Sequence, residues 1–394
     1  MKNRIIPLAG IALFLALLVL PTVLYLTVGE DTANLLNEKR KPVPFPTAVS
    51  DGVLGEVDAW YSDHAPYRLS LVTLQKRAAQ AYGVPYRERL HPVLSARLVP
   101  GWYRGETPYL APIEQSNVLY GREGWLYYSN KGSIDYYTGA NPLPEADMQA
   151  WKASFLRLKA ACEARGIRLV VAVAPNKEQV YPEYLPSLYI HSAVKREDAV
   201  AETMRAAGIP YLWLLPDLLA AKAQYPVLYR MQDTHWNGLG GYIGAMAMLR
   251  EAGLPTADLS EWTVTPVERT GGDLSNFVGY ATPYSEYRVA YKPGVALTRE
   301  DYKDGNISVY TSDADTDRKL VLVGDSFRTA CADILTRNFK TSVLLHRSRV
   351  TNKLVTKAVR ALGDGDVLIL MSLERYDAYN YGLADTLAGL LEAA

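Results

Sequence analysis

The chain has 394 residues, and its 42 acidic and 42 basic side chains leave a formal net charge of zero. A chain of this length can bury one large core or fold as two domains. The balanced charge leaves no electrostatic footprint for a nucleic acid, which argues against that class of partner. The two cysteines, Cys162 and Cys331, form no disulfide framework or zinc spacing, and both are expected to be buried apolar residues.

The first predicted element is an uncharged, mostly apolar segment, Ile5–Val28. As a helix it would span roughly 35 Å, enough to cross the hydrocarbon core of a bilayer. Lys2 and Arg4 precede it, whereas Glu30 and Asp31 follow, so the positive-inside rule predicts a cytoplasmic N-terminus and an extracytoplasmic body. A cleaved signal peptide is the alternative, but the segment is long for one and shows no convincing small-x-small cleavage site. We therefore predict a single-pass anchor in the cell membrane.

The anchor is assigned to residues 1–30, and residues 31–117 are predicted to form a linker followed by a partly helical, irregular segment. Closely spaced prolines after Lys41 favour extended backbone and a semi-stiff spacer. Short helices are expected at Val53–Trp60 and Leu69–Tyr82.

From residue 118 onward, apolar β runs alternate with helical segments. This pattern predicts an α/β fold in which helices cover both faces of a parallel sheet. A hairpin is expected at Val118–Tyr128, and the domain is expected to extend over residues 118–394. Residues 254–318 interrupt the alternation with turn residues and short Tyr-rich pieces, which indicates an insertion near the active edge. The predicted helices are Glu145–Arg165, Ser192–Ala207, Leu239–Ala252, Arg328–Phe339, Lys353–Ala361 and Leu383–Leu391, and the predicted strands are Arg168–Ala174, Pro210–Leu215, Lys319–Val323, Thr341–Leu345 and Asp366–Met371.

Two short polar motifs supply a serine, a histidine and a carboxylate. A Gly-Asp-Ser-Phe motif containing Ser326 follows the apolar run Leu320–Val323, and an Asp-Thr-His-Trp motif precedes a glycine-rich helix start. Functional residues of parallel sheets collect at the carboxyl ends of strands, where helix amides can also stabilise an oxyanion. A carboxylate such as Asp233 can bind Nδ1 of His235, two residues later, and leave Nε2 as the base for a serine.

Each motif also has a simpler structural interpretation. Ser326 can act as the N-cap of the following helix, and Asp233 can cap a turn. The four other histidines of the chain lie in no comparable setting, and none stands at metal-ligand spacing from His235, so no metal site is predicted. The two motifs together favour a nucleophilic hydrolase or acyltransferase over either alternative.

The two motifs resemble blocks of the SGNH hydrolases, but in reversed order, since the Asp/His block precedes the serine. This permuted order resembles the SGNH-like domain of the alginate O-acetyltransferases and the related DHHW proteins. The resemblance covers roughly residues 35 to 380. The further segments that carry it are Asn37–Arg40, Pro44–Pro46, Tyr61–Arg68, Gly124–Tyr128, Ala174–Lys177, Tyr181–Glu183, Leu185–Pro186 and Leu373–Tyr376.

The resemblance implies a circularly permuted SGNH-like fold and an extracytoplasmic, membrane-anchored O-acetyltransferase that acts on an exopolysaccharide or cell-wall glycan. It implies Ser326 as the nucleophile of an acetyl-serine intermediate, His235 as the base and Asp233 as the carboxylate that orients it, with no cofactor. It also implies a membrane-bound O-acyltransferase partner that supplies the acetyl group. A carbohydrate acetyl esterase and a non-catalytic scaffold of the polysaccharide machinery are the alternatives.

The sequence departs from the SGNH pattern at one block. Where SGNH enzymes place Gly-x-Asn-Asp, the chain reads Ser-Leu-Glu-Arg, so the side-chain Asn of the oxyanion hole is missing. The nucleophile's own amide is expected to act there with Asn176 or Arg375. Lys177 is expected either to contact an anionic sugar or to be solvated, and Trp236 either to line the cleft or to pack. Because no carbohydrate-binding module follows the Glu-Arg block, polymer contacts are expected within the domain itself.

Overall fold

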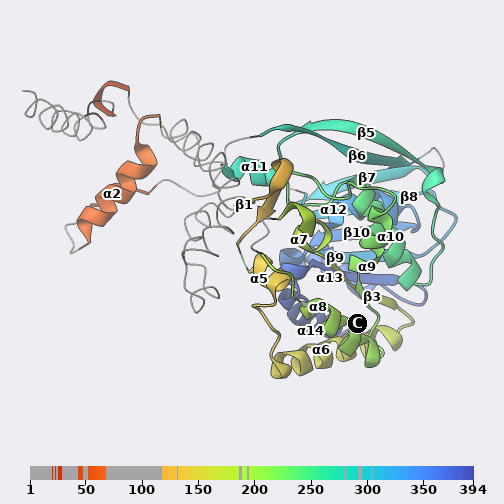
Figure 1. Cartoon of the computed structure of the whole chain (residues 1–394). Coiled ribbons are helices and arrows are strands. Elements are labelled where there is room, and N and C mark those ends of the chain that lie inside the picture. Colours follow the sequence, from red (N-terminus) through yellow and green to blue (C-terminus); the bar gives the residue numbers. More distant parts are fainter. Residues whose placement is uncertain are drawn as a thin grey trace, which may run out of the picture.

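A seven-stranded mixed sheet forms the centre of the molecule (Figure 1). The computed structural model describes residues 20, 23, 25–28, 43–47, 52–67, 118–130, 132–185, 189–192, 195–278, 281–291, 295–303 and 305–394. Across the sheet, the strands are Tyr211–Trp213 (β4), Arg168–Ala174 (β3), Val367–Leu373 (β11), Lys319–Gly324 (β9), Thr341–His346 (β10), Ile307–Ser312 (β8) and Leu297–Tyr302 (β7). From β4 to β10 neighbouring strands are parallel, whereas β8 pairs antiparallel with both β10 and β7.

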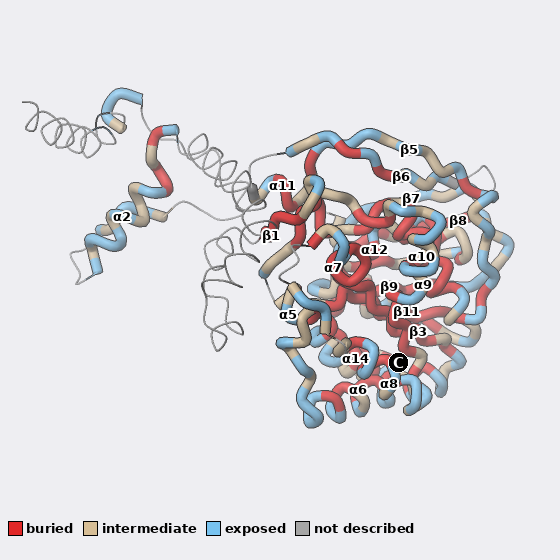
Figure 2. Tube along the Cα trace, viewed as in Figure 1, coloured by how far each residue is buried: buried red, intermediate tan, exposed pale blue. Residues whose placement is uncertain are grey.

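Three neighbouring strands, β3, β11 and β9, are buried along almost their whole length (Figure 2). A strand that is covered on both faces needs a continuous apolar run rather than an alternating one, and each fully buried aliphatic side chain contributes about 1.5–3 kcal/mol. The runs that predicted these strands from sequence are confirmed, with ends that differ by no more than a residue or two.

Helices cover both faces of the sheet (Figure 1). The helices predicted from Glu145 onward are present, although the one predicted from Ser192 begins at Arg196, the last one begins at Ala378 rather than Leu383, and the one after Ser326 ends at Thr336 rather than Phe339. Both cysteines are buried free thiols. One face carries Glu145–Glu163 (α6), Arg196–Ala206 (α8), Lys353–Arg360 (α13) and Ala378–Glu392 (α14), and the other carries Leu215–Lys222 (α9), Gly238–Glu251 (α10) and Arg328–Thr336 (α12).

The prediction of a parallel sheet is wrong at one edge. Strands β7 and β8 come from residues 254–318, and β8 joins the sheet antiparallel to β10. Neither strand carries a continuous apolar run, because β7 is mainly polar and β8 mixes serine and threonine with its apolar residues. The same segment forms an antiparallel ribbon of Trp262–Thr270 (β5) and Pro283–Tyr291 (β6), joined through Asp273–Val278 (α11). The ribbon packs on α10 and arches over one end of the domain (Figure 1).

The predicted hairpin is present as Val118–Tyr120 (β1) and Leu126–Tyr128 (β2). Helix α11 packs against both strands, and its Leu274 joins their small apolar cluster. The hairpin therefore connects the insertion to the rest of the domain. The short helices Ser133–Thr138 (α5) and Lys177–Val180 (α7), together with α9 and α11, were not predicted.

The N-terminal predictions need a correction. A membrane span requires about 20 apolar helical residues, and no helix in the described part of the chain is long and apolar enough. This finding overturns the predicted single-pass anchor and the location in the cell membrane, although most of Ile5–Val28 lies outside the described residues. The helix predicted at Val53–Trp60 is present as Val53–His64 (α2). The helix predicted at Leu69–Tyr82 and the irregular segment 83–117 lie outside the described residues.

Candidate active site

The carboxyl ends of β9, β11 and β3 meet at one edge of the sheet, because β11 lies between the other two strands. Ser326 follows β9, Arg375 follows β11, and Lys177 follows β3. This arrangement brings residues that are far apart in sequence to one edge, as expected for parallel α/β sheets.

The buried side chain of Asp325 fixes the turn that carries Ser326. Its Oδ1 accepts the amide of Phe327 at 2.9 Å, and its Oδ2 accepts the amide of Leu373 at 2.7 Å, which ties the turn to β11. The N-cap residue of α12 is Phe327, and no side chain caps this helix. The alternative interpretation of Ser326 as an N-cap is therefore wrong.

A short closed loop presents Asp233 and His235. Tyr229 and Trp236 form an isolated antiparallel bridge that closes the loop. Directly after it, Asn237 caps α10, since its side-chain oxygen accepts the amides of the second and third helical residues at 2.9 and 3.0 Å. The loop is thus held at its base by a bridge and a helix cap.

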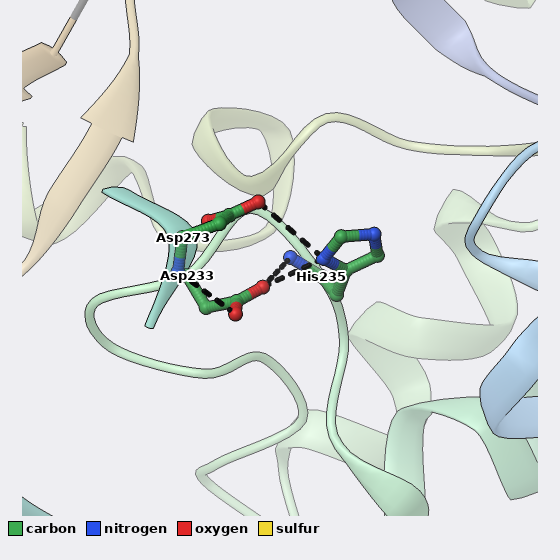
Figure 3. Close-up of side chains that lie close together, drawn as sticks. All are labelled: Asp233, His235 and Asp273. Atoms are coloured by element: carbon green, nitrogen blue, oxygen red, sulfur yellow. Dashed lines mark hydrogen bonds and ion pairs between the residues drawn. The ribbon is translucent and has the colours of Figure 1, made fainter. Parts of the chain in front are cut away.

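Three side chains form a continuous hydrogen-bonded chain. The Oγ of Ser326 lies 2.6 Å from Nε2 of His235. On the other side of the ring, Nδ1 of His235 lies 2.7 Å from Oδ1 of Asp233 (Figure 3). The same carboxylate oxygen accepts the backbone amide of His235 at 2.9 Å. A proton on Nδ1 leaves Nε2 free to accept the serine proton. The three residues predicted from the two motifs therefore meet in the order that nucleophilic catalysis requires.

The electrostatics of Asp233 favour its ionised form. Burial alone would raise the pKa of this carboxyl, but hydrogen bonds and the charge of His235, together with the amide of Asp273, hold it well below its usual range. An ionised carboxylate at this position can stabilise an imidazolium. Asp233, His235 and Asp273 offer atoms within 4.8 Å of one another, as a metal site would. Nδ1 of His235 pairs with Asp233, and both carboxylate oxygens of Asp273 accept from Thr234, so that the absence of a metal stays our prediction.

Lys177 supports the same loop from the protein interior. It is 3% exposed, and its ammonium group donates to the carbonyls of Arg230, Met231 and Asp233 at 3.0, 3.1 and 2.7 Å. All three of its donors are thereby used. Burial lowers the pKa of Lys177 to about 7, although the nearby charges of Asp233 and Asp273 act in the opposite direction and raise it. Neither expectation for this residue holds, because it is neither solvated nor placed to contact a sugar.

The other predicted accessory residues are packed against the protein. Asn176 is fully buried, and its Oδ1 accepts Nη1 of Arg375 at 3.0 Å, while its Nδ2 has no hydrogen-bond partner in the described part of the chain. Neither residue lines the cleft beside Ser326, and their oxyanion role stays a prediction. Trp236 is fully buried and donates Nε1 to the carbonyl of Phe327 at 3.0 Å, as the packing alternative predicts, and it also borders the cleft beside Ser326.

A cleft of about 700 Å³ opens beside Ser326 and His235. One wall of the cleft is the β5–β6 ribbon. Its residues were not predicted, because the sequence shows them only as short pieces of an insertion. The signal that could have found them is the alternation of apolar and polar residues along two segments that pair with each other. The charges in this wall are partly paired, since Arg230 and Arg269 approach the buried Glu286 at 3.3 and 2.6 Å. The ribbon residues that line the cleft are Val267, Glu268, Arg269, Thr270, Glu286, Tyr287, Arg288 and Val289.

Comparison with known proteins gives one family match over most of the domain. The model of the family described as SGNH hydrolase-like domain, acetyltransferase AlgX, matches residues 118–363. The protein of Pseudomonas aeruginosa named "Probable alginate O-acetylase AlgJ" is 32% identical over 171 residues, which cover 41% of this chain and 41% of that protein. The protein of the same name from Pseudomonas putida is 29% identical over 172 residues, or 41% of this chain and 42% of that one. The matched region therefore spans about two fifths of the length of these curated relatives.

Two similar solved structures have low sequence identity to the chain. The O-acetyltransferase domain of Pseudomonas putida AlgJ is 18% identical, with a TM-score of 0.45 over 70% of this chain and 99% of that one. Bacillus cereus PatB1 with a sulfonyl adduct is 15% identical, with a TM-score of 0.47 over 66% of this chain and 94% of that one.

Proposed function

Because the chain belongs to the family of SGNH hydrolase-like domains of the acetyltransferase AlgX, we propose that it is an O-acetyltransferase that acts on hydroxyls of a polysaccharide. The observation that carries the proposal is the hydrogen-bonded chain from Ser326 through His235 to Asp233, at 2.6 and 2.7 Å, beside an open cleft. The names of the related AlgJ proteins, alginate O-acetylases, support a polysaccharide as the acceptor.

In the proposed first half-reaction, Oγ of Ser326 attacks the carbonyl carbon of an acetyl ester while Nε2 of His235 takes the hydroxyl proton. The tetrahedral intermediate collapses, the ester C–O bond breaks, and His235 returns the proton to the departing alcohol. The product is acetyl-Ser326. Throughout, Asp233 keeps the Nδ1 hydrogen oriented and stabilises the imidazolium.

In the proposed second half-reaction, a sugar hydroxyl gives its proton to His235 and attacks acetyl-Ser326, and the serine leaves with that proton. The amide of Ser326 donates to no acceptor in the described part of the chain, so it is free to serve an oxyanion. Asn176 or Arg375 remains the proposed second donor. A membrane-bound O-acyltransferase is the proposed source of the acetyl group.

An acetyl esterase is the second candidate, because the side chain of Ser326 is exposed and water can reach an acetyl-enzyme there. Incubation of the full chain with p-nitrophenyl acetate, with and without oligosaccharide, separates the two. If the chain is a transferase, we expect acetylated oligosaccharide. If acetate is released at the same rate with and without oligosaccharide, the chain is an esterase.

Two substitutions test the shared chemistry. Ser326→Ala and His235→Ala should each lower turnover by roughly 10³-fold or more while the melting temperature stays close to that of the unchanged chain. Near-normal turnover by a folded Ser326→Ala variant would overturn the proposed function.

A further inference from the structure

A second carboxylate lies beside the ring of His235. Oδ2 of Asp273 is 3.6 Å from Nδ1, on the side of the ring that Asp233 contacts at 2.7 Å (Figure 3). The separation is too long for a hydrogen bond but short enough for a strong charge interaction. Asp273 begins α11, in the segment that joins the two ribbon strands.

The position of Asp273 is fixed by the Asp-Thr-His-Trp loop itself. The hydroxyl and the amide of Thr234 donate to its two carboxylate oxygens at 2.6 and 2.7 Å. In return, the amide of Asp273 donates to Oδ2 of Asp233 at 3.1 Å. The two carboxylates are therefore interlocked through hydrogen bonds that run in both directions between the loop and α11.

Gly272 allows this close approach. A Cβ at this position would lie 2.5 Å from Cβ of Asp233 and 2.6 Å from the carbonyl oxygen of Gln232. Any larger residue would push the start of α11 away from the loop and move Asp273 from the ring.

We propose that Asp273 is a positioning residue for His235, which adds a second negative charge at the Nδ1 side of the ring and fixes the loop through Thr234. The charge stabilises the imidazolium that forms when Ser326 gives up its proton. This role rests on the proposed function of the Ser326–His235 pair.

Charged and titratable groups reach His235 from several elements, but in the described part of the chain only two carboxylates lie within ion-pair distance of its ring. Removal of the Asp273 charge should therefore only destabilise the imidazolium form of His235, which then gives up its proton at lower pH. The other groups around the site are Arg230 on the same loop, Lys177 on α7, Arg269, Tyr284 and Glu286 on the ribbon, and Ser326 after β9.

The test uses Asp273→Asn in the full chain, with p-nitrophenyl acetate as the substrate. The acid limb of the pH profile of kcat/KM reports the base of the free enzyme. We expect this limb to move to lower pH by about 0.5–1 unit, kcat to fall about 3- to 30-fold and KM to stay within about twofold. Asp315→Asn, which removes a charge from an exposed loop residue, should change none of these.

A second measurement is independent of turnover. In a Ser326→Ala background, the NMR titration of the His235 ring should shift to lower pH when Asp273→Asn is added. If Asp273→Asn changes neither the acid limb of the pH profile nor the NMR titration, while Ser326→Ala is inactive, the proposed role of Asp273 is wrong and the proposed function stands. If Ser326→Ala is active, the proposed function fails first. If Asp273→Asn does not fold, Thr234→Val is the second variant, because it removes the hydroxyl that donates to Oδ2 of Asp273. A smaller shift of the acid limb and of the His235 titration to lower pH is then expected. No shift in either measurement would overturn the inference.

Discussion

Lys177 is the residue whose environment differs most from what the sequence suggested. It lies beside Glu178, a setting that favours a solvated side chain, yet α7 carries both residues into the interior. There the ammonium group replaces water as the donor for three loop carbonyls. The loop that presents Asp233 and His235 therefore depends on a cation that does not touch the substrate cleft.

Lys177→Met keeps the length of the side chain and removes these donors. Because three buried carbonyls would lose a partner, we expect the free energy of unfolding to fall by about 2–4 kcal/mol, and kcat to fall with it. Urea denaturation measures the first quantity. Lys340→Met, at an exposed position, is the matched control, and equal stability of the two variants would contradict the role of Lys177.

The buried carboxyl of Glu197 makes the free energy of unfolding of the protein depend on pH. Burial raises its pKa to about 8, and its Oε2 has no hydrogen-bond partner in the described part of the chain. The folded chain thus keeps a proton that the unfolded chain, with a pKa of 4.5 for this group, has lost. The contribution of Glu197 to the free energy of unfolding must therefore decrease as pH rises from about 4.5 to 8.

Glu197→Gln should remove this decrease and make the protein more stable than the unchanged chain near pH 8, with little difference near pH 5. Urea denaturation at both pH values is the measurement. Glu202→Gln, on the exposed side of the same helix, should behave like the unchanged chain. Glu178, Glu374 and Asp377 also have raised pKa values, so a smaller decrease should remain; a decrease as large as that of the unchanged chain would contradict the role of Glu197.

At the scale of elements, α10 shows why a helix can be rich in glycine. A Cβ on Gly241 would lie 2.6 Å from the carbonyl oxygen of Ala330 in α12, and one on Gly244 would lie 2.7 Å from the ring of Trp236. These glycines bring α10 against α12, the helix that follows Ser326. The close packing therefore joins the helix after His235 to the helix after the nucleophile.

Gly241→Ala should destabilise the protein, although alanine is intrinsically better in a helix by about 1 kcal/mol. The backbone contact forces the two helices apart, and we expect a net loss of about 1–3 kcal/mol in the free energy of unfolding. Gly382→Ala in α14, where an added Cβ meets no atom within 4 Å, should instead gain about 0.5–1 kcal/mol. Thermal melts of both variants check this contrast, and stabilisation by Gly241→Ala would refute it.

The elements that could be predicted from the sequence are those with a strong periodic signal. Buried apolar runs located β3, β9, β10 and β11, and the two polar motifs located Ser326, His235 and Asp233. The ribbon and strands β7 and β8 were missed because none of them carries a continuous apolar run, and most residues of β5 and β7 are exposed or half-buried. Asp273 carried no local signal, because its partners lie 39 and 40 positions away and only the folded ribbon brings it to them.

At the scale of the whole molecule, three parts of the chain meet at the cleft. The parallel half of the sheet supplies the serine, and the loop before α10 supplies the histidine and its carboxylate. Residues from the 254–318 segment supply one wall of the cleft and the second carboxylate. The ribbon segment thus contributes both to the charge beside His235 and to the wall of the cleft. Because eight of its residues line the cleft, differences in substrate among relatives are expected to map to the ribbon.

Mass spectrometry of the full chain after brief incubation with p-nitrophenyl acetate and an acid quench tests the central claim most directly. We predict one acetyl group on the peptide that contains Ser326, and no such label in the Ser326→Ala or His235→Ala chain. Turnover without acetylation of Ser326, or the same label in the His235→Ala chain, would contradict the mechanism.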